Sequence, residues 1–113
     1  MLYKDYQNTS LDLYINQGSD FEQVCQLLDS DGTPLELTSD MTLSIVIKKY
    51  YNTFIFYPGS VESVPNSPGF IKIKIPSSTT SLFTASRYVY QVKIAEGSES
   101  ICVLDGTIIV DRF

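Results

Sequence analysis

Residues 86–95 constrain the fold of this chain most, because two kinds of side chain alternate along the whole stretch. Large apolar side chains occupy every second position: Tyr88, Tyr90, Val92 and Ile94. The intervening positions are mostly polar. A period of two is typical of a strand with one buried face, and β-branched and aromatic residues favour such a strand.

Several shorter stretches show the same alternation or a similar apolar content. They are residues 11–16, 21–28, 41–50, 69–75 and 100–110, with a short edge strand at 61–64. Turn residues separate them, and the spacing is that of a β-sandwich. We therefore expect an all-β, immunoglobulin-like antiparallel β-sandwich of about seven strands, with one helical turn at 77–83 before the Tyr88 strand.

Two of these strands carry irregularities. In residues 21–28 the apolar positions change parity, which indicates either a bulge or partial burial of both faces. In residues 100–110 one parity holds Cys102, Leu104, Ile108 and Val110. Gly106 also lies in this strand, and a glycine there predicts a bulge or a close approach of another backbone segment.

Tyr88 is a candidate for a tyrosine corner. In immunoglobulin-like domains a tyrosine at the start of a central strand bonds back to the backbone just upstream, which here is residues 77–85. The alternative is that Tyr88 is a large core residue with a hydrated hydroxyl group.

The clearest turn signal is Asp29-Ser30-Asp31-Gly32-Thr33-Pro34. Asp side chains fold back on the backbone in such turns, and we expect Gly32 to adopt a positive φ. The spacing resembles the start of a calcium loop, but its twelfth position is Asp40 rather than glutamate. A plain turn is therefore expected at residues 29–34.

The helical turn expected at residues 77–83 begins with a serine, and we expect Ser77 to be its N-cap.

Composition limits the classes of partner. The chain has 113 residues and a net charge of −5, so one domain is expected, and neither nucleic acid nor an anionic membrane suits it. We divide it into an N-terminal arm at 1–10 and a sandwich domain at 11–113. No signal peptide is evident after Met1, so synthesis in a cytoplasm is expected, with Cys25 and Cys102 as unpaired thiols.

Catalytic motifs are lacking in the sequence. The chain has no histidine, which removes histidine-based triads and most zinc sites. It also lacks a Cys-x-x-Cys pair, a glycine-rich phosphate loop and a nucleophile elbow. We expect no enzyme, no cofactor, no metal and no small-molecule substrate.

The best functional lead is the apolar run at residues 50–57. Tyr51, Phe54, Ile55, Phe56 and Tyr57 load both faces of this one segment. It could be a strand covered on both sides or a loop folded onto its own core. Alternatively it is a protein-binding patch, because aromatic residues are enriched in interfaces and exposed apolar patches mark contact sites.

The N-terminal arm adds two further candidates for partner contact, Tyr3 and Tyr6. We expect the arm and the aromatic run to lie against neighbouring subunits, with strand addition as one mode of contact.

Four segments in this order resemble the small immunoglobulin-like virion proteins of tailed bacteriophages. They are residues 11–21, 28–38, 87–90 and 103–110, and a related pattern occurs in the N-terminal domain of phage upper baseplate proteins. The likeness spans about residues 11–110. It rests on turn and core positions, which specify a fold more sharply than a role.

The resemblance implies a structural component of a virion, most simply of the tail or baseplate, that is made in the host bacterial cytoplasm and binds other virion proteins in multiple copies per particle. Capsid decoration is an alternative place in the particle. A different function is a host-surface adhesin or carbohydrate-binding module, in which Tyr51 and Tyr57 would stack on sugar rings. The family pattern holds no catalytic residue.

Overall fold

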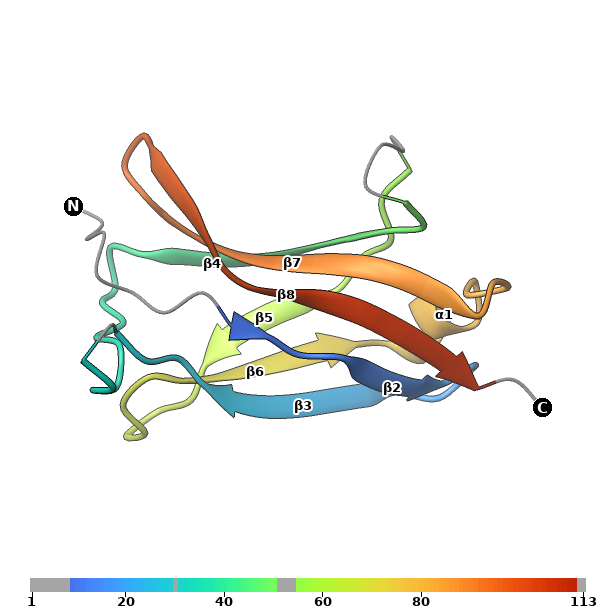
Figure 1. The fold of residues 1–113 in the computed structure, drawn as a ribbon, viewed down its shortest axis with the longest axis horizontal. Helices are drawn as coiled ribbons and strands as arrows, with labels where there is room; N and C mark the ends of the chain where they lie inside the picture. Colours follow the sequence, from blue (N-terminus) through green and yellow to red (C-terminus); the bar gives the residue numbers. More distant parts are fainter. Residues whose placement is uncertain (1–8, 30, 51–54, 112–113) are drawn as a thin grey trace.

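The computed structural model describes residues 9–29, 31–50 and 55–111. Two sheets face each other in it (Figure 1). The larger sheet contains β4 (Thr42–Lys48), β7 (Arg87–Glu96) and β8 (Glu99–Asp111), all paired antiparallel. Two short strands, β1 (Thr9–Ser10) and β2 (Leu13–Asn16), pair in parallel with β8 along its free edge.

The smaller sheet has three antiparallel strands in the order β3-β6-β5. These are β3 (Phe21–Gln26), β5 (Ser60–Ser63) and β6 (Phe70–Ile75). The only helix in the described part of the chain is α1 (Ser77–Thr80), between β6 and β7. The all-β, immunoglobulin-like sandwich expected from the sequence is confirmed, with the parallel pairing of β1 and β2 as an addition.

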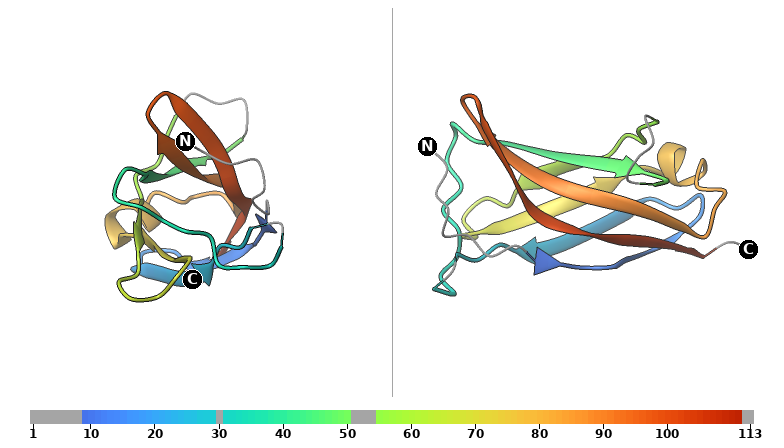
Figure 2. Two further views of the ribbon diagram at one scale, coloured as in Figure 1. Left: turned by 90° about the vertical axis from the view of Figure 1, so that its left-hand side faces the viewer. Right: turned by 45° about the horizontal axis from the view of Figure 1, so that its top comes forward.

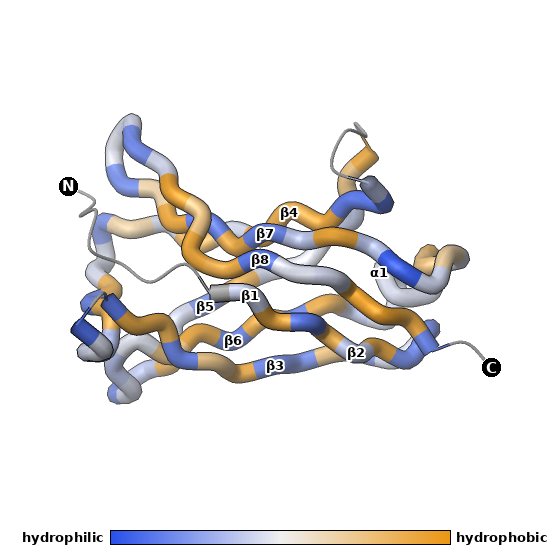
Figure 3. The backbone as a smooth tube through the Cα atoms, viewed as in Figure 1, coloured by the Kyte–Doolittle hydropathy of each residue, from blue (hydrophilic) through white to orange (hydrophobic). Residues whose placement is uncertain are grey.

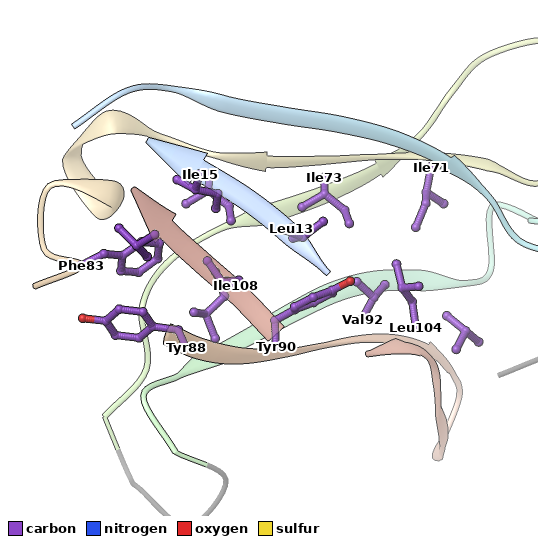
Figure 4. Close-up of a cluster of buried hydrophobic side chains, with 14 of the residues drawn as sticks. Leu13, Ile15, Ile71, Ile73, Phe83, Tyr88, Tyr90, Val92, Leu104 and Ile108 are labelled. Atoms are coloured by element: carbon purple, nitrogen blue, oxygen red, sulfur yellow. The ribbon is translucent and has the colours of Figure 1, made fainter. Parts of the chain in front are cut away.

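The core lies between the two sheets and is made by the side chains that the alternation predicted. Tyr88, Tyr90, Val92 and Ile94 of β7 are all almost fully buried. From the opposite sheet, Ile71, Ile73 and Ile75 face them, while Lys72 and Lys74 point outward. Figure 4 shows Tyr88 beside Phe83 at one end of this core and Tyr90 farther along it.

The tyrosine corner at Tyr88 is present. The backbone N–H of Ala85 donates a hydrogen bond of 3.1 Å to the Tyr88 hydroxyl oxygen, three residues upstream of the tyrosine. The ring stacks in a tilted arrangement on Phe83, with 4.4 Å between ring centroids. Tyr88 thus fixes the connection from α1 into β7, as in immunoglobulin-like domains.

Gly106 marks a close approach of the N-terminal segment to β8. A Cβ atom at this position would lie 2.1 Å from the carbonyl oxygen of Leu11. The Leu11 N–H donates to the carbonyl of Asp105 at 2.9 Å, and the Tyr90 hydroxyl donates to the carbonyl of Leu11. The sheet pairing begins at Thr9, within the stretch that we expected to be an arm. The remainder of that arm, residues 1–8, lies outside the described residues.

The bulge in the last strand lies at Val103 rather than at Gly106. Val92 of β7 is opposite Leu104, and Lys93 is opposite Cys102, so Val103 is an extra residue. Val103 and Leu104 are both buried, whereas Cys102 is only partly buried. The parity that Cys102 shares with Leu104, Ile108 and Val110 therefore does not place it on their face, because the bulge reverses the parity before it.

No bulge is needed in β3. Its pairing with β6 is regular from Phe21 to Gln26, and Val24 faces outward with 45% of its surface exposed. Neither of the two explanations left open for residues 21–28 applies to this strand, because the change of parity comes from an exposed apolar residue, Val24, on the outer face of the sheet.

The turn after β3 forms as expected. One carboxylate oxygen of Asp29 accepts hydrogen bonds from the N–H groups of Asp31 and Thr33, and Gly32 has a φ of +84°. This arrangement is an Asx-type turn. The segment at 35–38, expected to be extended, forms no strand.

The helical turn before β7 is also present, but Ser77 is not its N-cap. The N-cap is Pro76, whose side chain offers no hydrogen bond. Instead, the N–H of Ser77 donates to the Asp20 carboxylate at 2.7 Å, from the β2–β3 turn. In the described part of the chain, no helix is long and apolar enough to cross a membrane.

Candidate protein-binding surface

The β4–β5 connection exposes large apolar side chains at one end of the sandwich. Ile55 is 68% exposed and Phe56 is 59% exposed, while Tyr50 at the end of β4 is 57% exposed. Figure 2 shows this connection extending beyond the two sheets. Figure 3 places hydrophobic and strongly hydrophilic backbone segments next to each other there.

Tyr57 differs from its two predecessors. Its N–H donates to the Ile47 carbonyl at 3.0 Å, so the chain rejoins the edge of β4 at this point. Its ring contacts Phe83 and Tyr88 edge to face, with centroid distances of 5.5 and 5.2 Å. Burial is the main cause that raises the pKa of Tyr57, and Tyr88 adds to the shift. Tyr57 therefore packs at the rim of the core, and its role in partner contact stays a prediction.

A groove continues from Phe56 across the outer face of the larger sheet. We call it the lysine groove, and its lining residues are Val46, Lys48, Phe56, Val89, Tyr90, Gln91 and Lys93. The sheet register explains this set, because Val46 lies opposite Gln91 and Lys48 lies opposite Val89. The lining of the groove thus combines apolar side chains with Gln91 and two lysines.

Lysine ammonium groups cover the aromatic rings of this region. The Lys48 Nζ lies 5.0 Å from the centroid of the Phe56 ring, and the Lys49 Nζ lies 5.6 Å from that of Tyr50. Such cation–π contacts stabilise by roughly 0.5–1 kcal/mol at exposed sites. The Lys48 contact holds Phe56 beside the groove, and more than half of the Phe56 surface stays in water.

The outer face of the smaller sheet has a different charge pattern. There Lys74 forms a salt bridge of 3.1 Å with Glu62, which raises the pKa of Lys74. Glu22 and Glu62 lie opposite Lys74 and Lys72 in the register. The described residues lining the lysine groove include no acid. The positive charge of the groove is therefore not balanced by its own walls.

The structure brings together only part of the predicted contact set. Ile55 and Phe56 form the exposed rim of the groove, and Tyr57 is turned inward. The residues Tyr3, Tyr6, Tyr51 and Phe54 lie outside the described residues. Sequence reasoning missed Val46 and Val89, because single apolar residues on an outer face look the same as core positions. The adjacent Lys48-Lys49 pair was the one available signal.

The thiols offer no activated nucleophile. Cys25 and Cys102 are both free. Burial raises the pKa of the Cys25 thiol, and burial together with Asp105 raises that of Cys102. Since the thiolate is the reactive form, both groups are poor nucleophiles at neutral pH. Among the described residues, no three carboxylate or thiol groups gather in an arrangement able to hold a metal ion.

Comparisons with known proteins extend these observations little. No family model matches the chain, and no curated protein matches it. Nineteen chains of solved structures do match. One is the N-terminal Ig1-2 module of the Drosophila receptor protein tyrosine phosphatase DLAR, with 14% identity and a TM-score of 0.44, covering 97% of this chain and 47% of that one.

A second match, the tandem Ig repeats of Dlar, has 13% identity and a TM-score of 0.40 and covers 96% of this chain and 46% of that chain. This chain therefore spans about half the length of the structures it matches.

Proposed function

We propose that this chain is a non-enzymatic structural component of a tailed-phage virion, most simply of the tail or baseplate, and that it binds neighbouring virion proteins. Capsid decoration is the alternative place in the particle. The proposal draws its particle context from the sequence resemblance over residues 11–110. It draws its mode of action from one observation, the exposed Ile55–Phe56 rim beside the lysine groove.

This observation favours protein binding because exposed apolar surface is unfavourable in water. Exposing two large apolar side chains next to each other costs free energy in water, at roughly 25 cal/mol per Å² of apolar surface. A contact with a partner recovers that free energy. Aromatic residues are enriched in the cores of protein interfaces, and Phe56 lies in the β4–β5 connection beside the strands that line the groove.

The adhesin alternative has less support in the geometry. Sugar stacking by Tyr57 would need a free ring face, and its ring is packed against Phe83 and Tyr88. Tyr51, the other proposed stacking residue, lies outside the described residues.

The direct test is the protein composition of purified phage particles that encode this chain. Mass spectrometry should detect the chain in particles purified through a density gradient, at a constant ratio to the major capsid protein. A parallel screen of the isolated chain for esterase, glycosidase and glycan-binding activity should be blank. Absence of the chain from purified particles would refute the virion role, and turnover abolished by one side-chain substitution would refute the non-enzymatic role.

A further inference from the structure

The charge of the molecule is distributed unequally along its length of 42 Å. Residues 27–41, here called the acidic loop, connect β3 to β4 and contain Asp29, Asp31, Glu36 and Asp40 with no lysine or arginine. Figure 1 shows that the acidic loop and the β4–β5 connection lie at opposite ends of the sandwich. Four of the chain's thirteen acidic residues thus lie in a loop at one end, and the lysine groove begins at the other.

The acidic loop presents its charge to solvent on a fixed backbone. Asp31, Glu36 and Asp40 are exposed, while Leu35 and Leu37 pack partly against the core. The Leu35 N–H donates to the Leu27 carbonyl at 2.8 Å, and Leu27 is buried. The loop therefore projects its carboxylates outward, while its leucine side chains pack against the core.

We propose that the lysine groove of one copy receives the acidic loop of a second copy, so that copies associate head to tail. This inference rests on the proposed function in one respect: it names a second copy of the chain as the neighbour that the groove binds. The carboxylates of the loop would meet Lys48, Lys49 and Lys93, and Phe56 with Val46 would cover the apolar part of the contact. The groove lining has no acid of its own to compete for these lysines.

Charge complementarity favours a second copy over other occupants. The chain carries a net charge of −5, so two copies repel each other in most orientations. The head-to-tail orientation is an exception, because it places a basic groove against an acidic loop. A contact between two unlike surfaces is heterologous, and repetition of it produces a ring or a filament. Either form suits a component that repeats around a particle axis.

The association should depend strongly on salt. Sedimentation of the pure chain at about 0.01 M salt, where the Debye length is about 30 Å, should show a mass that rises with protein concentration. At about 1 M salt the Debye length falls to about 3 Å, and the chain should sediment as a monomer. A monomer at all concentrations in low salt, or association that strengthens with salt, would overturn the proposal.

Charge reversal supplies an independent test with a matched control. The groove variant K48E/K49E should be monomeric, because it sets carboxylates against the acidic loop. The loop variant E36K/D40K should also be monomeric, because its two lysines cancel the charges of Asp29 and Asp31 and leave the loop with no net charge. An equal mixture of the two should associate, since the unchanged groove of the loop variant can meet the unchanged acidic loop of the groove variant. The control K72E/K74E has the same net charge as the groove variant, but the change lies on the opposite face, so it should associate like the wild type.

The outcomes separate this inference from the virion role. A groove variant that associates like the wild type, or a mixture that stays monomeric, would refute the head-to-tail contact whatever the particle contains. Circular dichroism establishes that both variants are folded, and the salt series on the wild type needs no variant. Salt-sensitive association of a chain that is absent from purified particles would leave the contact standing and refute the proposed function.

Discussion

Two tyrosines on β7, two positions apart, perform different structural tasks. Tyr88 accepts a hydrogen bond from Ala85 and forms the corner before its strand. Tyr90 donates to the carbonyl of Leu11 and ties the N-terminal segment to the sheet. In antibody domains a cysteine stands two residues after the corner tyrosine and forms the disulfide between the sheets. Here a buried tyrosine occupies that position, and its hydroxyl bonds to a segment that pairs with the same sheet rather than with the opposite one.

Replacing Tyr90 by phenylalanine should lower the free energy of unfolding by about 1 kcal/mol, because the Leu11 carbonyl loses a hydrogen bond in a partly buried place. Urea denaturation followed by circular dichroism measures this. Tyr14→Phe is the matched control, since Tyr14 is 71% exposed and its change should cost almost nothing. An equal loss in both variants would contradict the role of the Tyr90 hydroxyl.

The raised pKa of Tyr90 predicts that stability depends on pH in the alkaline range. Burial is the main cause that raises the pKa of Tyr90, and burial also raises that of Tyr57. A raised pKa means that the folded state keeps the proton at a pH where the unfolded state releases it. The contribution of these two tyrosines to the free energy of unfolding is therefore constant below the ordinary tyrosine pKa of about 10 and falls as the pH rises above it. Tyr90→Phe should flatten this decline in urea titrations, and an unchanged slope would contradict the assignment.

Substitutions at Gly32 measure the cost of backbone strain separately from any effect of packing. Its φ of +84° is strained for other residues, yet a Cβ at this position would meet no atom within 4 Å. Gly32→Val should therefore cost about 1 kcal/mol or more in unfolding free energy through strain alone. Gly32→Asn should cost clearly less, because asparagine tolerates positive φ. Equal melting temperatures for the wild type and the valine variant would show that the turn rearranges freely.

The individual strands show where sequence patterns predict structure well. Alternation placed β2, β4, β6 and β7 within two residues of their observed ends, because burial of one sheet face requires a period of two. It failed at Cys102, since a bulge inserts a residue without any local composition signal. It also could not separate Tyr57 from Phe56, because only the pairing with Ile47 decides which of the two side chains enters the core.

Distant contacts were equally hidden from the sequence. The cap of α1 comes from Asp20, 57 positions away in the chain, and the partner of Gly106 is Leu11. The pattern at Gly106 indicated a close approach but not which segment approaches. The lysine groove belongs to the same class, since its walls come from β4, β7 and the β4–β5 connection.

Asp20 allows a test of how the α1 turn is held. Asp20→Ala should lower the unfolding free energy by about 1 kcal/mol, because the Ser77 N–H loses its acceptor at the start of α1. Asp20→Asn keeps an oxygen that can accept the same hydrogen bond and should recover most of this loss. Thermal unfolding of both variants provides the comparison. Equal destabilisation by alanine and asparagine would show that the charge of Asp20, rather than its hydrogen bond, matters.

At the scale of the whole molecule, the sandwich is longest along one axis, and its two ends differ. One end carries an acidic loop and the other carries cations beside exposed apolar side chains. The strands between them fix the distance and orientation of the two ends. Charged and apolar side chains distributed in this way suit contacts that have a direction, because each end of the molecule binds a different surface.

The central claim is that the Ile55–Phe56 rim and the lysine groove form a contact inside a virion. The most direct measurement is an electron-microscopy map of the intact particle at a resolution that shows side chains. We predict that the chain appears in symmetric copies and that Phe56 and Lys48 are covered by a neighbouring subunit. A map in which the chain is present but these two side chains face solvent in every copy would contradict the claim.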